Sequence, residues 1–512
     1  MAGLIFISAV SLFILYASLK REEVKIFYNR KLIYELCVII IVERGVNMSC
    51  ENYDVAILGC GTAGIFAGYE LAESLPSMKI LMIEQGSDIH RRKCPIIDKK
   101  VPSCIDCGSC GIMNGFGGAG AYSDGKFNFT TEFGGWLSEY IPDEECNRLF
   151  EYVDSVNIKF GATTERYSTR SEEAARIEKK ALENDLHLLH AVVKHLGTEN
   201  NLQILKDMFE YLENRVEIRC NTQVVKIEPE DGHYILHFAN GGSVRCTYLI
   251  AAPGRSGAEW FSQQCRELKL NLINNQVDIG VRVELPARVF EHITDVVYES
   301  KLKYRTKQYG DIVRTFCMNP YGHVVTENVE GIITVNGHSY TDPELRSENT
   351  NFALLVSNRF TEPFNEPYQY GKRIASLSNM LGGGVLVQRF GDLEKGIRTN
   401  EHRLKQSFTV PTLKATPGDL SLVLTKRHLD NIIEMIHALD KIAPGTANYD
   451  TLLYGVEVKF YSARLELSRE LETKLPNMFA AGDGAGITRG LSQAGASGVY
   501  AARVISNRIK GG

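Results

Sequence analysis

The chain has 512 residues, more than one ordinary hydrophobic core accommodates, and this length predicts about two to four domains or layers. Hydrophobic residues make up 44% and charged residues 23%, which is a globular composition without low-complexity bias. The formal net charge of −5 argues against a general nucleic-acid-binding surface, which would show as a basic excess, so we expect no nucleic-acid partner.

The N-terminal segment has two interpretations. Residues 2–19 are almost wholly apolar and are followed by Lys20 and Arg21, which fits a short membrane span with the rest of the chain on the cytoplasmic side. Alternatively, translation starts at Met48 and residues 1–47 lie outside the mature protein, because a strand begins only a few residues later. No cleavable secretory signal stands out. We therefore expect a cytoplasmic location, with the cytoplasmic face of a membrane as the alternative.

A strand–turn–helix–strand pattern follows Met48. The apolar run at residues 53–58 leads into Gly59, Gly61 and Gly64 of a GxGxxG turn, then a helical stretch, and a second apolar run ends at Glu84. The glycines allow a tight turn, close approach of a pyrophosphate, and close packing of the helix. The helix N-terminus favours phosphate, and Glu84 lies at the spacing that binds ribose hydroxyls. This pattern predicts a Rossmann-type dinucleotide site.

The other end of the chain carries a second glycine-rich motif, in residues 478–499. An apolar strand runs into Gly482 and Asp483, and a helix of small residues begins near Gly490. This resembles the second flavin motif of glutathione-reductase-like FAD proteins. The resemblance implies that Asp483 binds the ribitol chain and that the helix beginning near Gly490 points its positive end at the flavin ring.

Two further segments resemble the same flavoproteins. Val225 lies in a strand where the resemblance implies a backbone contact with adenine, and the turn around Gly254 would pass near the pyrophosphate. Arg91 and Arg92 fit the basic position near the pyrophosphate, and the glycine-rich stretch containing Gly118 fits the loop near the isoalloxazine. The motifs together predict FAD. No second GxGxxG follows a strand in residues 140–480, so NAD(P)H is expected only as a transient donor.

Four of the twelve cysteines are clustered, with the spacing C-x9-C-x2-C-x2-C; they are Cys94, Cys104, Cys107 and Cys110. Thiolates on a tight loop can hold an iron–sulfur cluster or a zinc ion. A redox-active dithiol and a loop of unliganded thiols are the alternatives. The cluster precedes the loop expected to contact the flavin, which favours a redox role.

The cysteine-rich loop, GGAGxxSDGK, APGRSG and GDGAGxTRGLxQAxASG together resemble a prokaryotic family described as FAD-dependent dehydrogenases, over residues from about 50 to 512. The resemblance implies an α/β fold, with a Rossmann-type FAD-binding domain, an inserted helical segment and a mixed α+β substrate domain. We expect the N-terminal extension at residues 1–47, a helical insertion at 137–208 and the substrate or cap domain at 261–449. The discontinuous FAD-binding domain would comprise residues 48–136, 209–260 and 450–512.

The cap domain offers two candidate catalytic residues. Cys317 ends a strand-like stretch and His338 lies in a polar turn; either could protonate a substrate opposite hydride delivery. Each is also explained as an ordinary packing or turn residue. The sequence thus predicts an FAD-dependent oxidoreductase acting on an unidentified small organic substrate. Alternatives are a flavin-dependent RNA-modifying protein and a flavin/Fe–S module that passes electrons to a carrier protein.

Overall fold

The computed structural model describes residues 50–511 except for a set of short gaps, at residues 96–97, 99, 102–104, 106, 169–170, 274, 298, 330, 341, 359, 361–363, 365 and 460–462. The predictions for residues 1–47, including the apolar stretch at 2–19, lie outside the described residues. In the described part of the chain, no helix is both long enough and apolar enough to cross a membrane. Residues from Glu51 onward form one compact unit that contains two large sheets.

The first sheet has seven strands and follows the predicted dinucleotide-binding pattern. Its central strands are parallel, because each is joined to the next by a crossover, while the last three form an antiparallel meander. In order across the sheet the strands are β7 (Glu217–Arg219), β2 (Ile80–Ile83), β1 (Glu51–Leu58), β10 (Ser243–Ala251), β9 (His233–Phe238) and β8 (Val224–Glu230), with β22 (Met478–Ala480) paired to β10.

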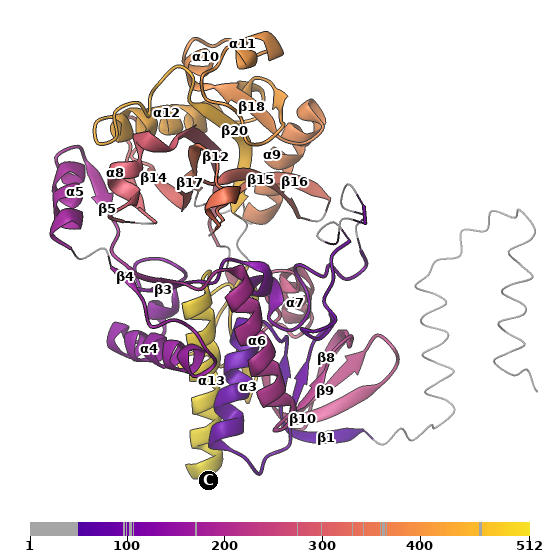
Figure 1. Ribbon diagram of the computed structural model, residues 1–512. Coiled ribbons are helices and arrows are strands. Elements are labelled where there is room, and N and C mark those ends of the chain that lie inside the picture. The colour runs from indigo at the N-terminus through magenta and orange to yellow at the C-terminus, as the bar shows by residue number, and fades with distance from the viewer. Residues whose placement is uncertain are drawn as a thin grey trace, which may run out of the picture. The chain divides into compact units, whose positions relative to one another are not determined.

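Two helices from opposite ends of the chain pack together beside this sheet. Figure 1 shows indigo α3 (Thr62–Ser74) next to yellow α13 (Leu491–Gly511). A Cβ at Gly498 would lie 2.0 Å from the Ala63 carbonyl oxygen, so the small residues of α13 are what permit this close contact. Further helices of the unit are α4 (Asp143–Lys159), α5 (Glu172–Leu182), α6 (Thr198–Glu213), α7 (Ala258–Glu267) and α8 (Glu291–Thr294).

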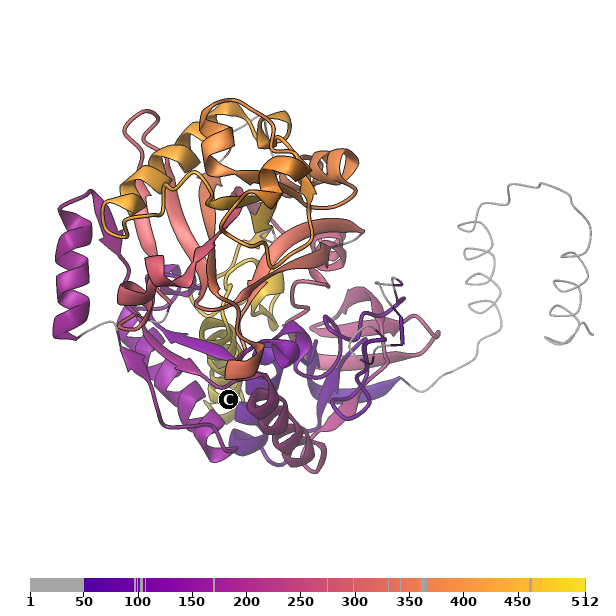
Figure 2. The ribbon, with the colours of Figure 1, turned by 45° about the horizontal axis from the view of Figure 1, so that its top comes forward.

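The second, eight-stranded sheet, here called the cap sheet, carries its own apolar core. Its inner strand β20 is buried along its length, as is β12 except for its last residue, and α12 (Lys426–Asp440) contributes apolar residues to the same core. Figure 2 shows the ribbon of this sheet with helices lying against it. In order the strands are β19 (Thr416–Pro417), β18 (Leu386–Arg389), β20 (Leu452–Lys459), β12 (Val277–Pro286), β17 (Asn349–Asn358), β14 (Ile312–Asn319), β13 (Leu302–Arg305) and β5 (Leu186–Leu188).

Smaller elements surround the two sheets. A hairpin of β15 and β16 lies beside the cap sheet, and β3, β6 and β4 form a small antiparallel sheet. Their bounds are β15 (His323–Val329), β16 (Ile332–His338), β3 (Lys126–Phe129), β6 (Val192–His195), β4 (Tyr167–Ser168), β11 (Leu272–Ile273), β21 (Arg464–Leu465), α9 (Pro367–Gly382), α10 (Phe390–Glu394) and α11 (Glu401–Lys405).

The structure differs from two of the predicted boundaries. Residues 137–208 are not purely helical, because they contribute strands to two sheets; in β5 the alternation of buried Leu186 and Leu188 with exposed His187 is a strand pattern. Residues 452–459 form β20 of the cap sheet rather than part of the first sheet. The partner of a fully buried strand cannot be identified from its own sequence, since apolar runs of this kind fit either sheet.

Candidate functional site

A cavity of about 1260 Å³ lies between the first sheet and the cap sheet. One end is lined by the glycine-rich turns that follow β1, β10 and β22, and the other by polar residues of the cap sheet. Polar and charged side chains converge on this cavity, which makes it the candidate ligand site. Eight of the predicted cofactor-binding residues line the cavity: Gly59, Gly61, Glu84, Gly118, Gly254, Gly482, Asp483 and Gly490.

Three glycines shape the turn between β1 and α3, and each has a different structural role. Gly59 has φ +97°, and a Cβ there would lie 2.2 Å from the Ala252 carbonyl oxygen. A Cβ at Gly64 would lie 1.9 Å from the Gly59 carbonyl oxygen, so Gly64 serves packing and does not line the cavity. Gly61 faces open space, with only the Gly118 Cα at 4.0 Å. The turn therefore leaves the backbone accessible where the predicted pyrophosphate approaches.

The N-terminus of α3 opens onto the same cavity. No side chain caps the helix at Gly61, and its first turn contains no acidic residue. Thr62 and Ala63 line the cavity. The first N–H groups of a helix have no partner within the helix and carry its positive dipole end, so this is a fitting site for phosphate oxygens.

The Glu84 carboxylate joins the turn between β1 and α3 to neighbouring loop segments. It accepts hydrogen bonds from the backbone N–H groups of Cys60, Gly86 and Gly115, each at 2.9 Å, and the residue is 6% exposed. A carboxylate offers about four acceptor sites, so capacity for one further donor remains. Ribose binding by Glu84 stays a prediction, and the observed bonds add a second duty of joining three loop segments.

Besides Gly64, three further predicted cofactor residues do not line the cavity. Arg91 is 80% exposed in its side chain and pairs with Asp88. The Val225 carbonyl accepts a hydrogen bond from the Trp260 indole, while the neighbouring Gln223 and Val224 line the cavity. Arg92 is buried, and its guanidinium donates to the backbone carbonyls of Gly111, Ile112, Phe116 and Gly118 at 2.7–3.0 Å. Arg92 thereby holds the glycine-rich loop in place.

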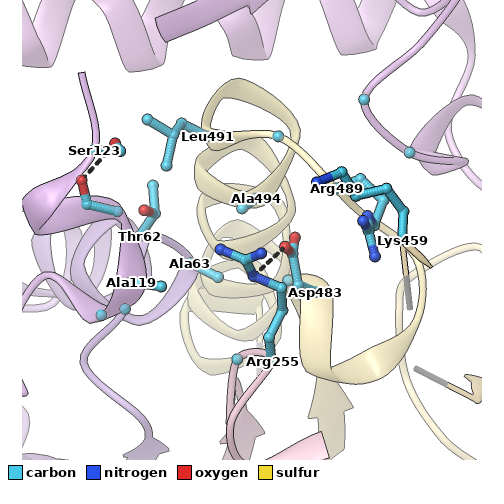
Figure 3. Close-up of a pocket in the computed structure, with 18 of the residues that line it drawn as sticks. Thr62, Ala63, Ala119, Ser123, Arg255, Lys459, Asp483, Arg489, Leu491 and Ala494 are labelled. Atoms are coloured by element: carbon cyan, nitrogen blue, oxygen red, sulfur yellow. Dashed lines mark hydrogen bonds and ion pairs between the residues drawn. The ribbon is translucent and has the colours of Figure 1, made fainter. Parts of the chain in front are cut away.

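The second motif supplies a carboxylate at the start of α13. Asp483 accepts a hydrogen bond from the Thr488 hydroxyl at 2.8 Å and lies 4.0 Å from the Arg255 guanidinium. Figure 3 shows Arg255 and Asp483 pointing toward one another beside the N-terminal end of α13, where Leu491 and Ala494 line the cavity. The first turn of α13 has no acidic residue, so its positive end is not neutralised locally.

The predicted cysteine centre is described only in part. Cys94 and Cys110 are half-buried and Cys107 is exposed, whereas Cys104 lies outside the described residues. Within the described ranges, no three His, Cys, Asp or Glu side chains are placed to hold a metal ion. Cys94, Cys107 and Cys110 are free thiols, and none of these three lines the cavity.

Both predicted catalytic residues line the cap end of the cavity. Burial raises the pKa of the Cys317 thiol, so it is neutral at pH 7. Its backbone has φ +45°, and its carbonyl accepts hydrogen bonds from Arg282 and Asn319. Burial lowers the pKa of His338, more than nearby Asp124 raises it, so the imidazole is also neutral at pH 7.

The structure adds charged residues to this end that sequence reasoning did not identify. The Lys301 ammonium lies 3.2 Å from Glu299 and 3.6 Å from the centre of the Phe133 ring, and the two charged side chains are only 6% and 5% exposed. Opposite them, Asp124 pairs with Lys126 at 3.0 Å and lies 3.4 Å from His195. The alternation of charged and apolar residues from 299 to 305 was the available signal.

Comparison with known proteins gives one family match. Residues 276–460 match the model described as "FAD-dependent protein, C-terminal domain-like", which covers the cap sheet from β12 to β20. An uncharacterized protein of Clostridium beijerinckii is 26% identical over 475 residues, covering 88% of this chain and 80% of its own. The motifs of the first sheet lie outside the matched residues and support the same cofactor independently.

Solved structures with distantly similar folds include a glycine oxidase and an L-proline dehydrogenase. Glycine oxidase from Geobacillus kaustophilus has 11% identity and a TM-score of 0.36, covering 89% of this chain and 95% of its own. L-proline dehydrogenase from P. horikoshii has 11% identity and a TM-score of 0.38, covering 90% and 94%. These values indicate distant likeness only.

The residues at the first-sheet end of the cavity fit FAD. Open glycine backbone, an uncapped helix N-terminus, buried Glu84 and half-buried Asp483 provide partners for the phosphates, ribose and ribitol of a dinucleotide. Together with the FAD-dependent domain match over residues 276–460, they support FAD as the cofactor of this α/β chain.

Proposed function

We propose that this protein exchanges a hydride between FAD and a small polar organic substrate that binds against the cap sheet. The observation that carries the proposal is that one continuous cavity is lined both by the dinucleotide motifs and by Glu299, Lys301, Cys317 and His338. The bound flavin supplies hydride acceptance or donation, while the protein binds, orients and moves protons.

His338 is the residue we propose to move the proton. Because its pKa is lowered, the imidazole is neutral at pH 7 and accepts the proton that a substrate O–H or N–H loses on oxidation. In the reverse direction the imidazolium returns that proton. The Tyr340 ring packs edge-on against His338, with ring centres 4.7 Å apart, and limits the orientations of the imidazole.

Cys317 has a different part in this proposal. A nucleophilic cysteine requires a thiolate, and a raised pKa keeps this thiol protonated. Its carbonyl is held at 3.0 Å by Arg282 and at 2.9 Å by Asn319, so the residue forms a fixed wall of the cavity. We therefore assign Cys317 to substrate positioning through its S–H group.

The test uses the full chain purified with FAD under anaerobic conditions. Bound flavin is quantified by absorption, and flavin reduction by a panel of small hydroxy and amino compounds is followed by stopped flow. In a second experiment the flavin is first reduced with NADH or NADPH, and its reoxidation by a panel of oxidants is followed. His338→Asn should keep the flavin and slow the reaction at least about a hundredfold, the size of a general acid–base contribution.

His323→Asn is the matched control, because His323 also packs against Tyr340 but does not line the cavity. It should leave the rate within about twofold. Equal rates in the His338 and His323 variants would remove His338 from the mechanism. A full-length protein that retains no FAD after purification with excess cofactor would overturn the proposed function itself.

A further inference from the structure

Side chains of the segment from Glu299 to Arg305 alternate between the cap core and the cavity. Ser300, Leu302 and Tyr304 are buried in the cap core, as expected for alternate residues of an extended strand. The residues between them all line the cavity, and they are Glu299, Lys301, Lys303 and Arg305. This row of four charged residues, here called the charged strip, runs along β13 and the residues just before it.

The charged strip changes character along its length. At one end the Glu299 and Lys301 side chains are 5% and 6% exposed and pair with each other. At the other end Lys303 and Arg305 are exposed, and within the described residues neither has a carboxylate partner; Arg305 donates only to the Gly310 carbonyl. The inner end is thus a closed ion pair, and the outer end carries two positive charges without local compensation.

The neighbouring strand adds positive charge at the same place. Lys303 on β13 is directly paired with Arg314 on β14, and Arg314 also lines the cavity. Like charges directly opposite one another on adjacent strands are destabilising unless an anion lies between them. Of the acids nearby, Asp278 pairs with Arg314 and leaves Lys303 and Arg305 as the uncompensated cations, while Asp311 accepts hydrogen bonds from Arg427 and Asn431.

The inner end of the strip has an unused acceptor. The Oε1 atom of Glu299 faces Lys301, whereas its Oε2 atom is buried in the cavity wall without a hydrogen-bond partner in the described structure. A buried carboxylate oxygen without a donor costs free energy, so this atom is suited to receive an O–H or N–H group from a ligand.

We infer that the charged strip binds an elongated anionic substrate, with a hydroxyl or amino group at Glu299 and a phosphate or carboxylate group at Lys303, Arg305 and Arg314. The strand rise places Glu299 and Lys303 about 13 Å apart, which sets the length of such a molecule. This inference rests on the proposed function and adds the class of substrate: a hydroxy or amino compound with a charged tail.

The experiment is a calorimetric titration of the FAD-loaded full chain at low salt, with inorganic pyrophosphate in one arm and citrate in the other. Either ion should bind, and the tighter one identifies the tail as phosphate or as carboxylate. Lys303→Ala/Arg305→Ala should weaken binding at least about tenfold, because each removes a charge-assisted contact.

Lys307→Ala is the matched control, since Lys307 pairs with Asp185 on the surface and does not line the cavity. Its dissociation constants should stay within about twofold of the parent. The inference is overturned if neither anion binds the parent, or if the double variant and Lys307→Ala bind alike. Flavin content and reduction by NADH or dithionite are measured on the same samples. If the double variant keeps reducible flavin, a failed titration contradicts only anion binding by the charged strip and does not contradict the proposed function.

Discussion

The two ends of the cavity recognise ligands by different means. The first-sheet end presents backbone, with open glycines and the uncapped start of α3, and few charged side chains. The cap end presents charged side chains on strands, including Lys301, Lys303 and Arg314. Backbone groups suit a cofactor whose pyrophosphate is the same in every cycle, whereas side chains can be changed without altering the fold. In the function we propose, this difference separates cofactor binding from substrate choice.

The largest effect should come from Gly64, where the backbone end of the cavity depends on close packing. In Gly64→Ala the new Cβ would lie 1.9 Å from the Gly59 carbonyl oxygen. We expect a loss of at least about 4 kcal/mol in the free energy of unfolding and loss of FAD, measured by urea denaturation and flavin absorption. Gly108→Ala is the control, because its Cβ meets nothing within 4 Å. Equal stability of the two variants would contradict this account of the turn.

The next largest effect tests the charges that support the cap end. Arg282 and Glu457 are fully buried and paired at 2.8 Å, and Lys459 joins Glu457 at 2.9 Å. Glu457→Gln leaves those cations uncompensated, so the free energy of unfolding should fall by about 3 kcal/mol. Glu466→Gln, which breaks the exposed pair with Lys474, should leave the free energy of unfolding nearly unchanged. Comparable losses in both variants would show that burial does not govern these pairs.

Lowering the pH should reduce the free energy of unfolding because the cap core contains a buried histidine. Burial lowers the pKa of His428 to about 4, from 6.5 in the unfolded chain. Above pH 6.5 both states are neutral and His428 contributes no pH dependence. Between pH 6.5 and 4 the unfolded chain binds the proton first, so the free energy of unfolding falls, by up to about 3 kcal/mol at pH 4.

His428→Gln should flatten this part of the pH profile in urea denaturation. Exposed His437, which pairs with Glu394, is the control, and His437→Gln should keep the parent slope. A His428 variant with an unchanged slope would place the acid sensitivity on other groups.

The smallest effect is expected at Gly61, which lies at the backbone end of the cavity. Its Cβ position is open in the structure, so Gly61→Ala should leave the free energy of unfolding of the apoprotein unchanged. The methyl group would occupy the space through which the pyrophosphate approaches, and FAD affinity should fall about tenfold, or about 1.4 kcal/mol. Fluorescence titration of apoprotein with FAD measures the change. Unaltered affinity would move the pyrophosphate away from this turn.

Local patterns were enough to predict the cofactor end. Glycine spacing, flanking apolar runs and the acid at Glu84 are short-range features, because a β–α–β unit is built from consecutive residues. The strands that the sequence suggested around Val225 (β8) and before Cys317 (β14) are present, whereas His338, expected in a polar turn, ends β16. From the sequence we predicted that β20 belongs to the FAD-binding domain, and we did not predict the strands between residues 137 and 208. Pairing of short buried strands depends on partners that are distant in the chain.

The sequence by itself therefore determined the α/β class, the dinucleotide motif and the choice of FAD, all of which depend on neighbouring residues. Tertiary structure alone decided that Arg92 holds a loop, that Cys317 and His338 meet the same cavity, and that Lys303 faces Arg314 across two strands. Those arrangements join residues far apart in the chain, and the low dielectric environment that shifts the pKa values of Cys317 and His338 exists only once both sheets have assembled.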